Sequence, residues 1–238
     1  MKILRIRGRK IISQEDLVDM RNRFDEQLDL LNKELIEMGA LCEEVIDLVT
    51  KALVSGKSNL AKKVAPLDSE IDQKERTIET MCLKLLLHQQ PVARDLRQIS
   101  SALKMITDME RIGDQAEDIA EIIGFLEKEE KRNCKLDGTT LQQMGDSAKK
   151  MVVESVTAYV NKDLDLARNV VKEDDIVDSL FLSVKKELIE RIALNKEEGE
   201  YILDLLMIAK YFERIGDHAV NIAQWVVFSV TGEHEAED

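Results

Sequence analysis

Apolar side chains recur every three or four residues along most of this 238-residue chain, which is the period of an amphipathic α-helix. The first periodic run covers 24–52, so we expect a helix that begins near residue 20 and ends where Ser55-Gly56-Lys57 interrupts the pattern. A second helix is expected over about 59–88, because the residue before a proline avoids helical dihedral angles. Pro91 then fits the opening of a third helix that extends to about residue 127.

The second half of the chain repeats the first. Met38-Gly39 recurs as Met144-Gly145, an offset of 106 residues, and the pentapeptide Glu-Arg-Ile-Gly-Asp occurs at 110–114 and again at 213–217, an offset of 103. The second copy therefore lacks three residues, which we place at the turn near 89–94 of the first.

We predict an all-α protein of two tandem-duplicated three-helix bundles, with six long helices that are antiparallel to their neighbours because the connections are short. The two bundles are expected at 20–130 and 137–232, joined by a charged linker. Residues 1–19, in which lysine and arginine alternate with isoleucine and leucine, are expected to form a separate basic arm.

Two helices of each copy carry a pair of acids four residues apart. Residues at that spacing lie on the same face of a helix, so each pair presents two carboxylates on one side. Antiparallel packing of the two helices would bring four carboxylates together in each copy. The acids are Asp68, Asp72, Glu110 and Asp114 in the first copy, and Asp174, Asp178, Glu213 and Asp217 in the second.

Two interpretations of these acids stay open. Like charges one turn apart destabilise a helix by roughly 0.2–0.5 kcal/mol per pair, so something must offset the repulsion. Surface salt bridges to Arg76, Arg94, Arg97, Arg111 and Arg214 are one solution. The other is a cation held by oxygen ligands, for which Mg²⁺, Mn²⁺ or iron suits a site without Cys or His. The duplication on two helices of both copies favours the cation.

Composition narrows the class of protein. With 34% charged, 44% hydrophobic and only 4% aromatic residues, the chain is typical of a helical protein. Its net charge of −13 argues against nucleic-acid or anionic-membrane binding. Cys42, Cys82 and Cys134 are too far apart for a disulfide framework or a zinc site, so we expect free thiols in the cytoplasm. No apolar stretch is long enough to span a membrane, and no signal peptide is expected.

Nothing in the sequence indicates catalysis, and we predict no catalytic residue. The chain has no Ser/His/Asp constellation and no phosphate-binding loop, and its histidines lack metal-ligand spacing. We expect His218 on the surface. Gly113 and Gly216, each inside a Glu-Arg-Ile-Gly-Asp copy, fall near the middle of apolar stripes. A glycine there costs about 1 kcal/mol relative to alanine, which suggests a close helix–helix approach.

The doubled Glu-Arg-Ile-Gly-Asp motif, the segment Gln-Gln-Pro-Val-Ala-Arg-Asp-Leu-Arg at 89–97 and the Asp-x-x-x-Asp pairs resemble the PhoU family of phosphate-transport accessory and signalling proteins. The resemblance covers about 20–230. It implies two similar three-helix bundles, a homodimer, and multinuclear metal clusters held by the eight acids named above. Additional ligands to the first cluster would be Glu75, Glu79 and Asp118. In the second copy those positions hold Phe181, Lys185 and Asn221, so we expect the first site to bind metal more tightly.

The resemblance also implies a regulatory role. Such proteins link a phosphate ABC transporter ATPase to a sensor histidine kinase and restrain phosphate uptake and the phosphate-starvation response when phosphate is plentiful. We therefore expect contact with the membrane only through these partners, and no nucleic-acid partner. The alternatives are a carboxylate-bridged metalloenzyme and a metal-free helical adaptor.

Overall fold

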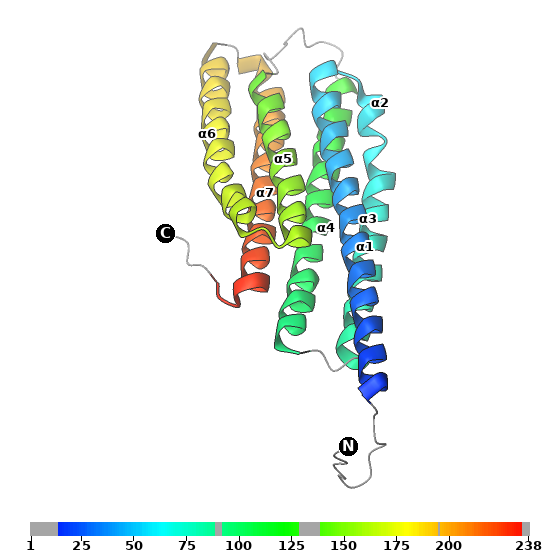
Figure 1. Cartoon of the computed structure of the whole chain (residues 1–238). Coiled ribbons are helices and arrows are strands. Elements are labelled where there is room, and N and C mark those ends of the chain that lie inside the picture. The colour runs from blue at the N-terminus through cyan, green and yellow to red at the C-terminus, as the bar shows by residue number, and fades with distance from the viewer. Residues whose placement is uncertain (1–13, 89–91, 129–138, 195, 235–238) are drawn as a thin grey trace.

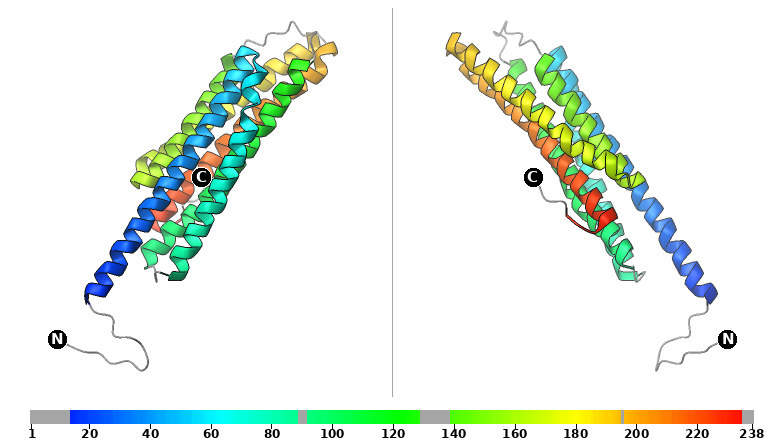
Figure 2. Two further views of the ribbon diagram at one scale, coloured as in Figure 1. Left: turned by 90° about the vertical axis from the view of Figure 1, so that its right-hand side faces the viewer. Right: turned by 60° about the vertical axis from the view of Figure 1, so that its left-hand side comes forward.

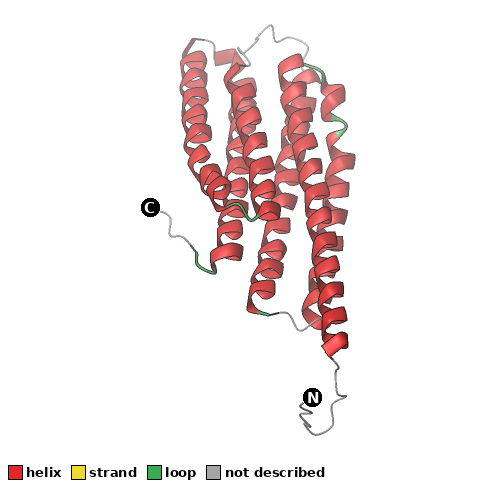
Figure 3. Ribbon diagram, viewed as in Figure 1, coloured by secondary structure: helices red, strands yellow, loops and turns green. Residues whose placement is uncertain are grey.

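The computed structural model describes residues 14–88, 92–128, 139–194 and 196–234. Within these ranges the chain is helical and forms no strand (Figure 3), which confirms the all-α prediction. The elements are α1 (Gln14–Ser55), α2 (Ser58–Ala61), α3 (Val64–His88), α4 (Ala93–Lys128), α5 (Thr139–Asn161), α6 (Leu164–Leu194), the short 3-10 helix η1 (Lys196–Glu198) and α7 (Gly199–Thr231).

Two helix boundaries differ from those expected. Helix α1 begins at Gln14, so the last residues assigned to the basic arm are helical, and the rest of the arm lies outside the described residues. The helix expected over 59–88 is broken at Lys62-Lys63 into α2 and α3. Pro66 explains the break, because it has no N–H to donate to the carbonyl of residue 62 and its ring would clash there. The equivalent position in the second repeat is Lys172, and α6 is continuous.

The long helices run along one axis and form an elongated bundle (Figures 1 and 2). Helices α1, α3 and α4 belong to the first repeat, and α5, α6 and α7 belong to the second. The repeats meet where α4 packs along α7 and α1 packs along α5. Figure 1 shows α6 at one edge of the bundle and α2 and α3 at the opposite edge. The buried apolar side chains of both repeats form one continuous core.

The contact between α1 and α5 is antiparallel and is made by matching residues of the two repeats. A Cβ atom added to Gly39 would lie 3.1 Å from Val156, and one added to Gly145 would lie 2.3 Å from the Thr50 hydroxyl. The offset of 106 relates Gly39 to Gly145 and Thr50 to Val156. Each repeat therefore supplies one glycine and one β-branched side chain to the other.

Two further expectations can be compared with the fold. Cys42 and Cys82 are buried free thiols, as predicted, and burial raises the pKa of each to about 12. Cys134 lies outside the described residues. Among the described helices, none combines the length and the apolar composition needed to cross a bilayer.

Candidate functional site

The carboxylate of Asp68 lies inside the contact between α3 and α4. The residue is 8% exposed, and its Oδ1 atom is buried without a hydrogen-bond partner among the described residues. A Cβ atom added to Gly113 would lie only 2.4 Å from that oxygen and 3.1 Å from Ile71. The expected close approach at Gly113 is therefore present, and the missing side chain leaves room for a carboxylate as well as for the helix.

Four further acids surround Asp68. Burial raises the pKa of Asp68 to about 6, and the neighbouring negative charges add to this effect. The structure thus brings the four acids expected in the first copy into one electrostatic group. It also adds Glu117, which the sequence analysis missed although its spacing from Glu110 and Asp114 puts it on the same helix face. The acids whose charges raise the pKa of Asp68, from the largest effect to the smallest, are Glu117, Asp114, Asp72 and Glu110.

The second copy repeats this arrangement between α6 and α7. The Oδ1 atom of Asp174 is buried without a partner among the described residues, and it lies 3.3 Å from the position of a Cβ atom on Gly216. Burial again raises the pKa of the carboxyl to about 6, and the negative charges around it make a smaller contribution in the same direction. These neighbours are Asp217, Asp178, Asp175 and Glu213, so Asp175 joins the four acids that were expected.

Basic side chains pair with several of the outer acids but not with the inner ones. In the first copy, Arg111 lies 3.4 Å from Glu110 and 3.2 Å from Asp114, and Arg76 lies 3.4 Å from Asp72. In the second copy, the acid Glu213 pairs with Lys210. The salt-bridge interpretation therefore describes four outer acids, Asp72, Glu110, Asp114 and Glu213. Asp68 and Asp174 have no cation in hydrogen-bond contact within the described chain.

Two of the arginines considered as counter-charges lie elsewhere. Arg94 and Arg97 are at the start of α4, about 20–24 Å from Glu110 at 1.5 Å per residue. Arg97 packs over Gly232, the residue that ends α7. Neither arginine can offset the charge of the acid clusters.

The three additional acids have different positions. Glu75 contributes to the raised pKa of Glu110, so it borders the first cluster. The charge of Glu79 raises the pKa of Glu75, and Glu79 lies one helical turn further along α3. Asp118 lies near the second repeat, where its charge adds to the effect of burial in raising the pKa of Tyr211 of α7. Of the three, only Glu75 adjoins the four expected acids.

The expectation that His218 lies on the surface is wrong. Its Nδ1 atom is 2.9 Å from a carboxylate oxygen of Asp108, and the side chain is only 17% exposed. The amide of Asn221 donates to the same oxygen at 3.1 Å. The helix periodicity shows which face is outside a three-helix unit, but it does not show that α7 packs along α4 and covers that face.

The chemistry of the two clusters suits a hard or borderline cation. Their ligand atoms are all carboxylate oxygens, and each cluster has one buried oxygen without a partner in the described structure. The side chains do not converge as they stand: across the described residues, no three acids, histidines or cysteines form a ready-made metal cage. The donors therefore fit a metal ion in type, and metal binding stays a prediction.

Comparison with known proteins identifies relatives along nearly the whole chain. The family model described as PhoU domain matches twice, at residues 35–123 and 141–226. A phosphate-specific transport system accessory protein PhoU homolog of Clostridium acetobutylicum is 36% identical, covering 89% of this chain and 96% of the relative. The homolog of the same name in Pseudomonas aeruginosa is 34% identical over 88% of this chain and 86% of the relative.

Solved structures agree with these matches. The crystal structure of PhoU from Pseudomonas aeruginosa has a TM-score of 0.83 and 33% identity, and the match covers 88% of this chain and all of that one. The phosphate transport system regulatory protein PhoU from Streptococcus pneumoniae has a TM-score of 0.80 at 27% identity, covering 90% of this chain and all of that one. The names of these relatives describe accessory or regulatory proteins and no enzyme.

Proposed function

This chain belongs to the PhoU family, and on that premise we propose that it is a regulatory accessory protein of a phosphate-specific transport system. It would restrain phosphate uptake and the phosphate-starvation response when phosphate is plentiful. The observation that carries the proposal is the match of the family to both repeats, together with relatives named for phosphate-specific transport over nearly their full length.

In this proposal the protein acts by binding and not by catalysis. It couples the ATPase of a phosphate ABC transporter to a sensor histidine kinase, and it reaches the membrane only through these partners. The proposal places the protein in the cytoplasm and includes a homodimer. The acid clusters support a binding role, because their carboxylate oxygens are ligands of the type that hard and borderline cations prefer.

The acid clusters are the proposed metal sites of the regulator. Asp68 and Asp174 would supply the inner oxygens, and the outer acids of each copy would complete the ligand set. A bound iron, manganese or magnesium ion would supply the positive charge that the inner carboxylates lack. The raised pKa values of about 6 support this role, since they show how strongly the metal-free clusters disfavour a further negative charge.

A pull-down from phosphate-replete cells tests the regulatory proposal. The tagged full-length chain should recover the transporter ATPase and the kinase, and elemental analysis of the same sample should find bound metal. Recovery of neither partner would overturn the coupling. The variant Asp72→Asn/Asp114→Asn should lose metal from the first cluster, whereas the exposed Glu26→Gln serves as the matched control.

A metal-free adaptor remains the second candidate, because Arg111 and Arg76 already pair with outer acids of the first cluster. The same experiment separates the two. Recovery of both partners by a chain that contains no metal, or by a chelator-treated chain at unchanged yield, would favour the adaptor.

A further inference from the structure

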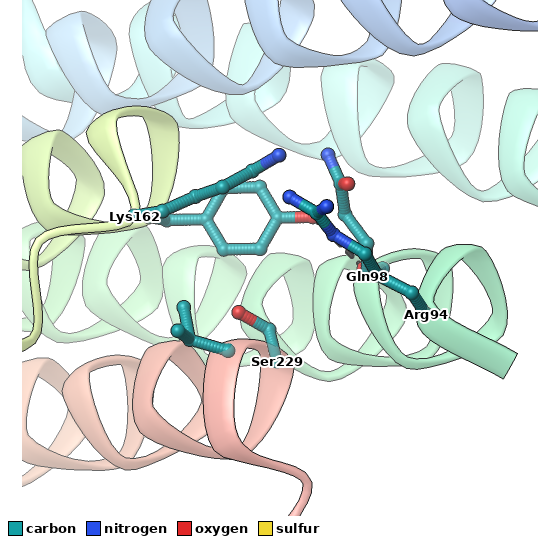
Figure 4. A pocket seen from close by; sticks show the side chains of 6 residues that line it. Arg94, Gln98, Lys162 and Ser229 are labelled. Atoms are coloured by element: carbon teal, nitrogen blue, oxygen red, sulfur yellow. Dashed lines mark hydrogen bonds between the residues drawn. The ribbon is translucent and has the colours of Figure 1, made fainter.

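A pocket of about 360 Å³ lies where the two repeats meet at one end of the bundle, away from both acid clusters. Figure 4 shows its walls, which come from the start of α4, the turn between α5 and α6, and the last residues of α7. Two helices begin and two end around this space, so their dipoles largely cancel and the side chains set its electrostatics. The lining residues are Arg94, Gln98, Tyr159, Lys162, Ser229 and Val230.

Two cations and a buried amide point into the same space. Figure 4 shows the ends of Arg94, Lys162 and Gln98 converging from two different elements. Gln98 is 9% exposed, and its side chain ends close to those of Arg94 and Lys162. Among the described residues, no acid forms an ion pair with Arg94 or Lys162. A side-chain amide carries two N–H donors and one acceptor oxygen, so Gln98 can hydrogen-bond to a polar ligand at this position.

The nearest buried acid is already occupied. Asp95 accepts hydrogen bonds from the guanidinium of Arg21 at 2.7 Å and from the backbone N–H of Val92 at 3.2 Å. It therefore does not neutralise Arg94, although the two residues are adjacent in the chain. An adjoining hollow shares Arg94, Gln98 and Lys162 with the acids Asp25, Asp29 and Asp95. Asp25 and Asp95 pair with Arg21, and no acid of the described structure forms an ion pair with Arg94 or Lys162.

The floor of the pocket is fixed and neutral. The Tyr159 hydroxyl donates to the backbone carbonyl of Gln98 at 2.8 Å, and the Ser229 hydroxyl donates to the carbonyl of Val226 at 2.8 Å. Burial raises the pKa of Tyr159, so the phenol adds no negative charge that would repel an anion. Arg94, Lys162 and Gln98 are thus the groups whose donors can meet a ligand.

The backbone of Lys162 adds an independent observation. Its φ angle is +56°, a left-handed conformation that side chains other than glycine rarely adopt. The equivalent turn of the first repeat, 106 residues earlier, has Gly56 with φ +66°. The second repeat therefore holds a lysine in a turn where glycine would be less strained, and strain of this kind is characteristic of functional positions.

We propose that this pocket binds a tetrahedral oxyanion of the phosphate class, either inorganic phosphate or the terminal group of a phosphate monoester. The planar fork of Arg94 and the ammonium of Lys162 complement two charged oxygens, and the amide N–H of Gln98 donates to a third. The proposal goes beyond the regulatory role and does not depend on it, because it concerns only ligand binding. It also needs no metal, because neither acid cluster lies at this pocket.

Calorimetric titration of the full-length, chelator-treated protein tests the proposal. Separate titrations with inorganic phosphate and with phenyl phosphate, at matched ionic strength, distinguish the two sources of the same chemistry. We expect one bound anion per chain for at least one of them. Arg94→Gln and Lys162→Gln should each weaken binding at least tenfold, and the exposed Lys186→Gln should leave it unchanged.

Lys162→Gly separates loss of the ligand from loss of the fold. Glycine suits the left-handed turn, so this variant should unfold at a higher temperature than the parent while binding at least tenfold more weakly. The proposal is overturned if neither anion binds at millimolar concentration, if Lys162→Gly and Arg94→Gln retain full affinity, or if binding appears only after metal is restored. None of these results would bear on the recovery of the transporter ATPase or the kinase.

Discussion

At the residue scale, the inner aspartates are the least expected feature of the acid clusters. The spacing of Asp68 and Asp72 predicts that both lie on one helix face, and it does so correctly. It does not predict that Asp68 is buried while Asp72 stays partly exposed. That difference depends on the space over Gly113, which appears only when α4 packs on α3.

We predict that Asp68→Asn stabilises the metal-free protein at pH 8, by about 1–2 kcal/mol. A carboxyl whose pKa rises from the usual 3.8 to about 6 on folding is disfavoured in its charged form, and asparagine removes that charge. Because the folded state holds this proton more tightly than the unfolded state, the parent should lose stability as the pH rises from about 4 to about 6. The variant should lose less over the same window. Urea unfolding with chelator present measures both effects.

The control for this prediction is Asp29→Asn, which removes an exposed acid of α1. Its stability should follow that of the parent at every pH. If Asp68→Asn were destabilising at pH 8 in chelator, the carboxylate would be making a favourable contact in the metal-free protein. That result would contradict the structure, in which Oδ1 of Asp68 has no hydrogen-bond partner among the described residues.

A second residue-scale prediction concerns Lys162. Replacing it by glycine should raise the free energy of unfolding by about 1 kcal/mol, because the left-handed backbone conformation is strained for a lysine. Thermal or urea unfolding measures the gain. The reverse change at the equivalent turn, Gly56→Lys, should lower stability by a similar amount, whereas an unchanged stability in both variants would show that the turns relax freely.

At the scale of elements, sequence periodicity predicted the long helices but not their interruptions. Pro66 was visible in the sequence, yet the apolar pattern continues across it and suggests one helix over 59–88. The break at Lys62-Lys63 arises because Pro66 lacks an N–H group and its ring would clash with the preceding turn. The spacing of apolar residues carries no information about either effect. The second repeat acts as the control, since Lys172 leaves α6 intact.

The contact between α1 and α5 predicts different sensitivity at two glycines. Gly145→Ala should lower the free energy of unfolding by about 1–3 kcal/mol, because the new methyl group would overlap the side chain of Thr50. Thr50 is stiff, and its hydroxyl already donates to the carbonyl of Ile46 at 2.8 Å. Gly39→Ala should cost less, since the nearest atom of Val156 is 3.1 Å away. Equal losses in urea unfolding would contradict this account.

At the scale of the whole molecule, the repeat itself was predictable and the packing between repeats was not. Constant offsets establish two similar halves without any structural information. The sequence does not show which helix packs on each helix face. His218, for example, contacts Asp108, a residue 110 positions away in the chain. A sequence pattern gives the direction of a side chain relative to its own helix, whereas the interface depends on how two units dock.

The whole-molecule prediction concerns metal. If cations occupy both clusters, adding Mn²⁺ to the chelator-treated protein should stabilise it by about 2.7 kcal/mol per site at a free concentration of 100 Kd. Asp68→Asn should remove more of this gain than Asp174→Asn. Glu75 borders the first cluster, whereas Phe181 holds the equivalent position in the second copy, so the first cluster has one more carboxylate available to a cation. Equal gains in parent and variants would argue against both sites.

The reciprocal contact between α1 and α5 has a consequence for the history of the chain. When Gly39 meets Val156 and Gly145 meets Thr50, the two halves are related as the subunits of a two-fold symmetric dimer, in which each surface binds its own copy. A shorter gene that encoded one repeat would already carry both sides of this contact. Its product would assemble as a pair, and fusion of two such genes would make the partnership permanent and leave each half free to diverge.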